Sequence, residues 1–469
     1  MAGWCQRVGA VGRWVSLAVI GLGLAVPAAA VAQINGPALT LQLQVQPQGN
    51  DKFHSAEFRL WVPEIKGPLR GVIIRQHGCG RKGLDHADDV QWQALALKHH
   101  CALLGSHFVP TDKCADWFEP QGGSERALLV ALETFAEQTK RPELAKVPWA
   151  IWGHSGGALW AMHLLNRRPQ RVAAVWARSQ ALVEMQPAAR AVPVMLNYGV
   201  GEQVGKFEAV HRNSLASFNK HRPAGALWAL AVDPKSSHDC RESRRLAVPW
   251  FDAVLTLRLP ERAGEADLRP LAGAEGWLGN TGTLAIASAA EYAGDKLQAC
   301  WLPNEAVARQ WQEYCKTGTV ADPTRPPAPT QVKALFKDGV VTLSWAATAD
   351  LESGTRRFHI YRDGEKIGSL GGAVGGANKN GDYQTHNYGD EPEPRPAPLR
   401  FTDPHGQLRS RYEVTQENHA GLESPPSPPV VPEDCKDCRQ CNNRDGQRST
   451  GWGPVRPGNL ASISRKNAP

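Results

Sequence analysis

The stretch VPWAIWGHSGGALWAMHLL, residues 147–165, carries most of the information about the fold. An apolar run typical of a buried strand leads into GHSGG, residues 153–157, and an apolar pattern with helical spacing follows. A turn from strand to helix does not by itself need a serine between glycines. Glycines are needed, however, when a tight turn must present a serine side chain, because the residues two positions before and after the serine must then be small. The stretch therefore predicts a serine nucleophile at Ser155.

Short apolar runs and helical segments alternate on both sides of this stretch. Strands are predicted at residues 38–45, 56–63, 70–78, 101–108, 147–153, 171–179, 192–199 and 226–233. Helices are predicted at residues 122–141, 157–168 and 244–260. The alternation predicts an α/β domain over residues 33–260, with a mostly parallel sheet that helices cover on both faces.

A second glycine-rich motif, HGCG at residues 77–80, follows an early predicted strand. It resembles the H-G-x-G loop of α/β-hydrolase esterases, and with the G-x-S-x-G turn it makes residues 60–259 resemble the α/β-hydrolase family. The resemblance implies an eight-stranded sheet and acyl-transfer hydrolysis without a metal or an organic cofactor. It also implies that the backbone N–H groups of Cys79 and Gly156 hold the oxyanion. The alternatives for Cys79 are a nucleophilic thiol or a disulfide.

The catalytic residues of this family follow the chain order serine, acid, histidine. His238 lies in the loop after the predicted strand 226–233 and before the predicted helix 244–260, where the family has its base. His211 and His221 lie in the segment between the predicted strands 192–199 and 226–233, which is expected to be helical, and are weaker candidates. The resemblance therefore implies that His238 takes the proton of the serine.

The acid is expected after the predicted strand VPVMLNYG. Glu202 is the nearest carboxylate to the end of this strand, and Asp233, in the loop of the predicted base, is the main alternative. Glu184 and Glu208 are weaker candidates. The role of the acid would be to hold the histidine in one tautomer and to stabilise the imidazolium ion.

The first residues predict export. Arg7 and Arg13 precede an apolar run that ends in AVA, residues 30–32, which fits an A-x-A cleavage site. Residues 1–32 are therefore interpreted as a secretory signal peptide, with a retained membrane anchor as the alternative. No later run is apolar and long enough to span a bilayer. The mature chain is expected to be secreted or periplasmic, in a compartment where disulfides form.

Cysteine usage agrees with such a compartment, although spacing does not determine connectivity. Two local pairs, Cys101–Cys114 and Cys300–Cys315, are the simplest choices. Three disulfides are conceivable among the six cysteines that precede the tail: Cys79, Cys101, Cys114, Cys240, Cys300 and Cys315.

The tail, residues 433–469, is polar and basic. Together with the first residues it carries most of the net charge of +7, so the rest of the chain has no basic face for nucleic acid. Cys435, Cys438 and Cys441 have the spacing of metal ligands. Because no fourth ligand is evident and the compartment is oxidising, the tail is interpreted as disordered and free of metal.

The pattern of the chain changes after residue 260. Residues 261–322 are interpreted as a C-terminal extension of the α/β domain, and residues 323–432 as a proline-rich linker with an all-β domain. Trp345 in an early strand, the FHIYRDG hairpin and Tyr412 in YEVTQENHAG resemble a fibronectin type III domain. The resemblance implies a sandwich in which Trp345 fills the core and Tyr412 forms a tyrosine corner. The insert at residues 371–398 is longer than in that family and is expected to be mobile.

These motifs together predict a secreted serine hydrolase, with a carboxylic ester hydrolase that uses Ser155, His238 and Glu202 as the main hypothesis. Its substrate could be a carbohydrate ester, a polyester or a small acyl ester, and its oligomeric state stays open. The alternatives are a serine peptidase of the same fold, or a binding or adhesion protein with an inactive hydrolase domain. The all-β domain is expected to be a passive spacer. Three tryptophans near the turn are expected in the core rather than stacked on substrate: Trp152, Trp160 and Trp176.

Overall fold

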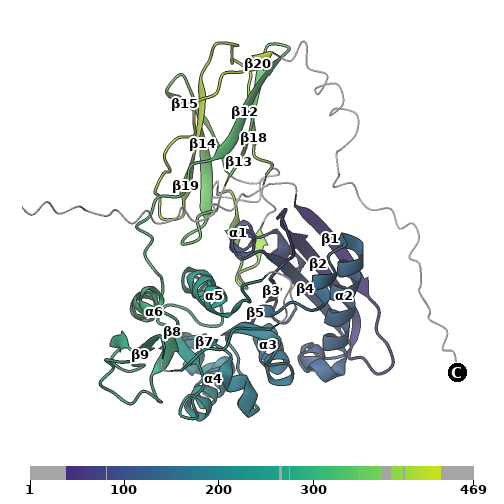
Figure 1. The fold of residues 1–469 in the computed structure, drawn as a ribbon, viewed down its shortest axis with the longest axis vertical. Coiled ribbons are helices and arrows are strands. Elements are labelled where there is room, and N and C mark those ends of the chain that lie inside the picture. The colour runs from purple at the N-terminus through teal and green to yellow at the C-terminus, as the bar shows by residue number, and fades with distance from the viewer. Residues whose placement is uncertain are drawn as a thin grey trace, which may run out of the picture. The chain divides into compact units, whose positions relative to one another are not determined.

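The computed structural model describes residues 38–434, apart from 81, 263–266, 274, 348, 372–381 and 394–396. The predicted signal peptide and the three cysteines of the tail lie outside the described residues. The described chain builds an α/β part, a small extension and an all-β part within one compact unit (Figure 1). None of the helices described is both long and apolar enough to cross a membrane.

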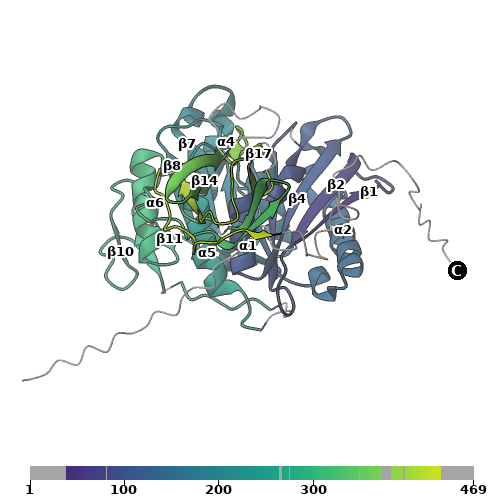
Figure 2. The same cartoon turned by 90° about the horizontal axis from the view of Figure 1, so that it is seen from above.

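The central sheet has eight strands in the order β1-β2-β4-β3-β5-β6-β7-β8. They are β1 (Leu39–Val45), β2 (Phe53–Val62), β3 (Gly71–Gln76), β4 (Cys101–Pro110), β5 (Trp149–His154), β6 (Val172–Arg178), β7 (Val194–Gly199) and β8 (Trp228–Asp233). β1 and β2 pair antiparallel, β2 is antiparallel to β4, and the other neighbours are parallel. Figure 2 shows β1 and β2 at one end of the sheet and β7 and β8 at the other. This mixed, mostly parallel sheet fits the α/β-hydrolase fold.

Helices cover both faces of this sheet. They are α1 (Val90–Lys98), α2 (Ser124–Thr139), α3 (Gly156–Arg167), α4 (Glu208–His221) and α5 (Arg244–Arg258). Figure 1 shows α3 and α4 on one side of the sheet and α5 on the other, and α1 packs against α5. The inner strands β3, β5, β6 and β7 are buried at every position, as expected for parallel strands covered on both faces. The loops that carry the predicted site residues follow the carboxyl ends of β3, β5, β7 and β8.

One of these helices, α1, was not among the predicted elements. Its N-cap is Asp89, whose carboxylate accepts the backbone N–H groups of Gln91 and Trp92 at 3.1 and 3.3 Å. Six of its nine residues are buried, so the one-sided apolar pattern of a surface helix is missing. The capping residue Asp89 was the signal in the sequence that could have revealed helix α1.

A small extension packs at the β8 edge of the sheet. It contains the strands β9 (Trp277–Gly279), β10 (Ile286–Ser288) and β11 (Cys300–Leu302), followed by α6 (Glu305–Thr317). The indole N–H of Trp311 in α6 donates to the carbonyl of Leu230 in β8 at 2.9 Å. Cys300, Trp311 and Tyr314 are buried in the core of the α/β part. The extension therefore shares its core with the sheet.

Two further sheets follow the linker. One has the order β18-β13-β12-β20 and the other β15-β14-β19. Their strands are β12 (Thr330–Lys337), β13 (Val340–Ala346), β14 (Thr355–Arg362), β15 (Glu365–Leu370), β18 (Arg400–Asp403), β19 (Tyr412–Asn418) and β20 (Glu433–Asp434), and a separate short pair is β16 (Thr385–His386) and β17 (Pro392–Glu393). Trp345 is 6% exposed in the core that the two sheets share, with its ring 5.7 Å from that of Phe358.

Tyr412 differs from the predicted tyrosine corner. It is fully buried, and its hydroxyl donates to the carboxylate of Asp403 at 2.7 Å. In fibronectin type III domains the corresponding hydroxyl bonds to the backbone. The assignment of this all-β part to that family therefore stays a prediction.

Four charged side chains are buried together beside α1 and α5. Arg75 of β3 pairs with Asp89 at 2.9 Å and with Asp390 at 2.5 Å. Arg244 of α5 pairs with the same two carboxylates at 2.8 and 2.7 Å. Each charge thus has two partners of opposite sign, which compensates its loss of hydration. Asp390 belongs to the insert 371–398, so the expectation of a mobile insert is wrong for this part of it.

Replacing Arg75 by leucine should lower the free energy of unfolding by about 3–5 kcal/mol, because Asp89 and Asp390 would each lose one of two buried partners. Arg212→Ala is the matched control. Arg212 pairs with Glu208 on the exposed surface of α4, where an ion pair contributes little. Denaturant unfolding of both variants measures the difference, and equal effects would show that the buried cluster does not stabilise the fold.

Candidate active site

Ser155 lies on the tight turn between β5 and α3. Its backbone has φ 55° and ψ −118°, a conformation that costs a residue other than glycine about 1–3 kcal/mol. The Ser155 N–H donates to the carbonyl of Arg178 at 2.8 Å, and the Ser155 carbonyl accepts the N–H of Ala158 at 3.0 Å. Helix α3 begins at the next residue, so its N-terminal N–H groups and its dipole are directed at the serine.

The glycines around Ser155 are required by close approach. A methyl group at Gly153 would lie 2.3 Å from the carbonyl oxygen of Gly157. One at Gly157 would lie 2.4 Å from the carbonyl oxygens of Gln76 and His77, at the end of β3. Neither position has room for a side chain. The turn packs directly against β3 and presents Ser155 at the carboxyl edge of the sheet.

His238 reaches Ser155 from the loop after β8. Its Nε2 lies 2.9 Å from the Oγ of Ser155, and its Nδ1 lies 2.5 Å from the Oε1 of Glu202. Glu202 is fully buried on a short 3-10 helix after β7, and its Oε2 accepts the Ser179 hydroxyl and the Gly199 N–H at 3.1 Å each. If Nδ1–H donates to Glu202, Nε2 is in the state that accepts the serine proton. The structure thus brings the three predicted side chains together.

The alternative acids have other contacts. Asp233 accepts the hydroxyl of Tyr314 at 3.0 Å and the N–H of Lys235 at 2.8 Å. Glu184 and Glu208 lie on the surface, each in an ion pair with a basic side chain. Glu202 is therefore the candidate acid that the structure places against the predicted base.

The weaker histidine candidates belong to the packing of α4. The ring of His221 bonds to the carbonyl of Val183 at 2.8 Å, and the ring of His211 lies 4.9 Å from that of Tyr198. Neither contact involves Ser155. His238 is thus the candidate that the structure places at the serine.

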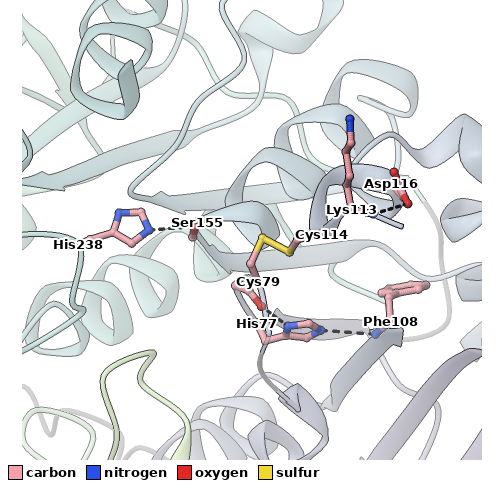
Figure 3. The surroundings of a disulfide bond; sticks show 9 residues. His77, Cys79, Phe108, Lys113, Cys114, Asp116, Ser155 and His238 are labelled. Carbon is pink, nitrogen blue, oxygen red and sulfur yellow. Dashed lines mark hydrogen bonds between the residues drawn. A yellow bond between two sulfur atoms is a disulfide. The ribbon is translucent and has the colours of Figure 1, made fainter. Parts of the chain in front are cut away.

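The HGCG loop after β3 passes over Ser155. A methyl group at Gly78 would lie 3.1 Å from the Cβ of Ser155, so the loop backbone touches the turn. Cys79 forms a disulfide with Cys114, which begins a short 3-10 helix after β4, and Figure 3 shows this bond beside Ser155. The disulfide ties the predicted oxyanion loop to a second segment of the chain.

The buried side chain of His77 supports the same loop. Its Nδ1–H donates to the carbonyl of Gly78, and its Nε2 accepts the N–H of Phe108 at 3.4 Å (Figure 3). Complete burial lowers the pKa of His77 to about 3, so the ring is neutral at pH 7. A neutral ring with one donor and one acceptor matches these two contacts.

The Cys79–Cys114 disulfide corrects two sequence-based choices. The pairs Cys101–Cys114 and Cys300–Cys315 are wrong, because Cys114 pairs with Cys79 and the other three are free thiols. Cys79 is also unsuited as a nucleophile, because its sulfur is held in the disulfide. Spacing along the chain could not reveal a pair that brings two different loops together.

Arg178 is a functional candidate that sequence reasoning missed. It ends β6, is fully buried, and donates to the Ser236 hydroxyl and the Ser237 carbonyl at 2.9 Å each and to the Asp239 carbonyl. These groups lie on both sides of His238, so Arg178 is a positioning residue for the histidine loop. Its signal in the sequence is a single arginine at the end of an otherwise apolar strand.

Two rings also fix the orientation of His238. Phe207 stacks on the imidazole with a centroid distance of 3.9 Å and an interplanar angle of 4°. His154, the residue before Ser155, bonds through its Nε2 to the carbonyl of His238 at 2.7 Å. The histidine is thus held at its ring and at its backbone.

The tryptophans near the turn belong to the core. All three are fully buried, as expected: Trp152, Trp160 and Trp176. Among the described residues, no group of three or more His, Cys, Asp or Glu side chains is placed to hold a metal ion. The cysteine-containing tail lies outside those residues.

No family model matches the chain, and neither does any curated protein. Solved structures with some likeness include a thermostable esterase, with 16% identity and a TM-score of 0.33 over 41% of this chain and 54% of that one. The chain thus spans about half the length of that esterase. A ferulic acid esterase has 13% identity and a TM-score of 0.36 over 47% and 98% of the two chains. LpqC, a poly(3-hydroxybutyrate) depolymerase from Bordetella parapertussis, has 15% identity and a TM-score of 0.32 over 48% and 92%. Likenesses this weak carry no argument, so the function must be inferred from the geometry of the site.

The two candidate acids can be separated by mutation. Glu202→Gln should lower kcat for p-nitrophenyl acetate by about 10³–10⁴-fold, because an amide favours the wrong tautomer of His238. Asp233→Asn is the matched control, since it keeps an acceptor oxygen for Tyr314 and should leave kcat within a factor of a few. Steady-state kinetics measures both variants, and a larger loss in Asp233→Asn would make Asp233 the acid.

Opening the disulfide should loosen the HGCG loop. Cys114→Ser should lower the free energy of unfolding by about 2–4 kcal/mol and reduce kcat, because the loop over Ser155 loses its tie. Cys79→Ser should lower stability and kcat by the same amounts as Cys114→Ser, since the backbone N–H of residue 79 remains. Cys315→Ala, which removes a free thiol in α6, is the control. Thermal unfolding and ester hydrolysis are the measurements. A loss of activity confined to Cys79→Ser would indicate a chemical role for that sulfur.

Proposed function

We propose that the chain is a serine ester hydrolase that works through an acyl-enzyme. A serine hydroxyl is a poor nucleophile unless a base lies within hydrogen-bond reach and a third group orients that base. The observation that carries the proposal is the continuous chain of contacts from Ser155 to His238 at 2.9 Å and from His238 to Glu202 at 2.5 Å. The strained backbone of Ser155 is a second support, because such strain persists where function requires it.

In the first half-reaction, the Oγ of Ser155 bonds to the carbonyl carbon of the ester while Nε2 of His238 takes the hydroxyl proton. The carbonyl oxygen becomes an oxyanion, and the N–H groups of Cys79 and Gly156 are assigned to bind it. Glu202 stabilises the imidazolium ion that forms. Collapse of the tetrahedral species breaks the bond to the alcohol oxygen, and His238 returns the proton to the leaving alcohol.

The second half-reaction repeats these roles with water. His238 removes a proton from a water molecule, whose oxygen attacks the carbonyl carbon of the acyl-Ser155 ester. A second tetrahedral species forms in the same oxyanion site. Its collapse releases the carboxylic acid, and the proton returns to the Oγ of Ser155.

Apolar side chains near the site support an ester with an apolar acyl group. Phe207 stacks on His238 and is half-buried. In the same segment, Val200 is 40% and Val204 is 72% exposed. An apolar side chain in contact with a reactive group, as Phe207 is, favours binding of an apolar ligand. We propose as substrates a carbohydrate ester, a polyester or a small acyl ester.

The proposal includes export of the enzyme. Its supports are the predicted signal peptide, residues 1–32, and the Cys79–Cys114 disulfide, which is compatible with an oxidising compartment. It also includes a fibronectin type III assignment for the all-β part, supported by the buried Trp345 between the two sheets.

Hydrolysis of short-chain p-nitrophenyl esters by the mature protein tests this function. Ser155→Ala should reduce kcat by about 10⁵–10⁶-fold, because it removes the nucleophile itself. Ser288→Ala, which changes a serine of the small β10 strand, should keep the wild-type rate. Equal rates in wild type and Ser155→Ala would exclude Ser155 as the nucleophile.

A further inference from the structure

Residues 382–391 of the insert pack against the α/β part next to the histidine loop. The N–H of Cys240, two residues after His238, donates to the carbonyl of Tyr388 at 2.9 Å. The side-chain amide of Gln384 bonds to the backbone at the start of α1 through both its oxygen and its nitrogen, at 3.1 Å each. The all-β part thus reaches the loop that carries the proposed base.

Asp390 anchors this segment. It is 1% exposed, and its carboxylate pairs with Arg75 at 2.5 Å and with Arg244 at 2.7 Å. Breaking a buried pair of this kind by removing one partner is strongly unfavourable, so the attachment is firm. Tyr388, two residues earlier, is held in place by the same attachment.

Tyr388 lies near two histidines of the site and also lines a cavity. Its ring centroid is 5.7 Å from that of His154 and 6.4 Å from that of His238, and the residue is 45% exposed. Tyr388 also lines a cavity of about 650 Å³, together with Asp239, the residue after His238. The cavity therefore borders the loop that carries His238.

The side chains that line this cavity are either neutral or paired with a side chain of opposite charge. Burial lowers the pKa of His419 to about 4, so this lining side chain is neutral at pH 7 and offers one donor and one acceptor. The remaining lining includes the amides and hydroxyls of Gln384, Thr385 and Asn387. Three arginines line the cavity, each paired with a lining carboxylate: Arg241 with Asp239 at 2.7 Å, Arg244 with Asp390 at 2.7 Å and Arg245 with Glu242 at 3.2 Å.

We propose that this cavity binds the alcohol portion of the ester, a neutral group rich in hydroxyls such as a sugar, and that Tyr388 is a specificity-determining contact for it. A wall with balanced charge and many neutral donors and acceptors suits hydroxyl groups better than an ionic group. A tyrosine ring next to it provides a flat face for a sugar ring. The proposal rests on the proposed function and makes the all-β part a component of the substrate site rather than a passive spacer.

The chemistry explains why the alcohol belongs on this side. His238 gives its proton to the oxygen of the leaving alcohol, so that oxygen must lie next to the imidazole. The acyl group must then extend away from the histidine loop. Asp239 follows His238 in the chain and the Tyr388 ring lies 6.4 Å from the His238 ring, so the cavity that both residues line is on the histidine side of Ser155.

Binding of neutral oligosaccharides to the full mature chain carrying Ser155→Ala tests the proposal without requiring hydrolysis. Titration calorimetry with xylohexaose, cellohexaose and mannohexaose should show binding of at least one of them with a Kd below roughly 1 mM. Tyr388→Ala in the same background should weaken that binding at least tenfold, and Tyr388→Trp, which keeps an aromatic face, should retain most of it. Tyr361→Ala in β14, a tyrosine outside the cavity, is the matched control.

Three outcomes would overturn the proposal. They are no binding of any of the three sugars, equally tight binding of hexagalacturonate, and unchanged sugar binding in Tyr388→Ala. Thermal unfolding of each variant verifies that the half-exposed tyrosine was replaced without loss of the fold. Sugar binding by a protein that hydrolyses no ester would contradict the proposed function alone, because the calorimetric result does not depend on catalysis.

Discussion

The close approach of Gly157 to the end of β3 is the constraint on which the site depends. No side chain fits there, so the chain must turn sharply after β5 and start α3 at once. Ser155 takes up the strained backbone at the bend, and its hydroxyl meets the loop from β8 that carries His238. Glu202 reaches the same histidine from the end of β7. Parallel strands with their carboxyl ends at one edge bring these loops together, although they are far apart in sequence.

Buried charge holds the surrounding loops in place. Arg178 bonds to the backbone or hydroxyl groups on both sides of His238. Arg75 of β3 and Arg244 of α5 both bind Asp89 at the start of α1 and Asp390 of the all-β part. Such groups are costly to bury, and an apolar core of equal volume would often be as stable. Their directional contacts orient loops that an apolar core would leave less constrained. This explains why two fully buried arginines lie next to the candidate active site.

Local patterns could predict much of the fold and the candidate site. The strands and the turn at Ser155 follow from periodicity and glycine spacing. The predictions of His238 and Glu202 also needed the chain order of catalytic residues that the resemblance to α/β-hydrolases implies. Contacts between distant residues could not be predicted in this way. Arg178 and Ser236 are 58 positions apart, Arg75 and Asp390 are 315 apart, and Cys79 and Cys114 are 35 apart. Helix α1 was missed because a largely buried helix lacks the one-sided pattern on which periodicity depends.

Covalent labelling shows directly whether Ser155 is an activated nucleophile. The mature protein would be treated with a fluorophosphonate, digested with trypsin and analysed by mass spectrometry. Ser155 lies in the tryptic peptide of residues 147–167, which contains no other serine and no cysteine. We expect one phosphonyl group per chain on this peptide, and no label in Glu202→Gln under the same brief exposure. An unlabelled peptide 147–167, or labelling of another residue in its place, would exclude Ser155 as the activated nucleophile.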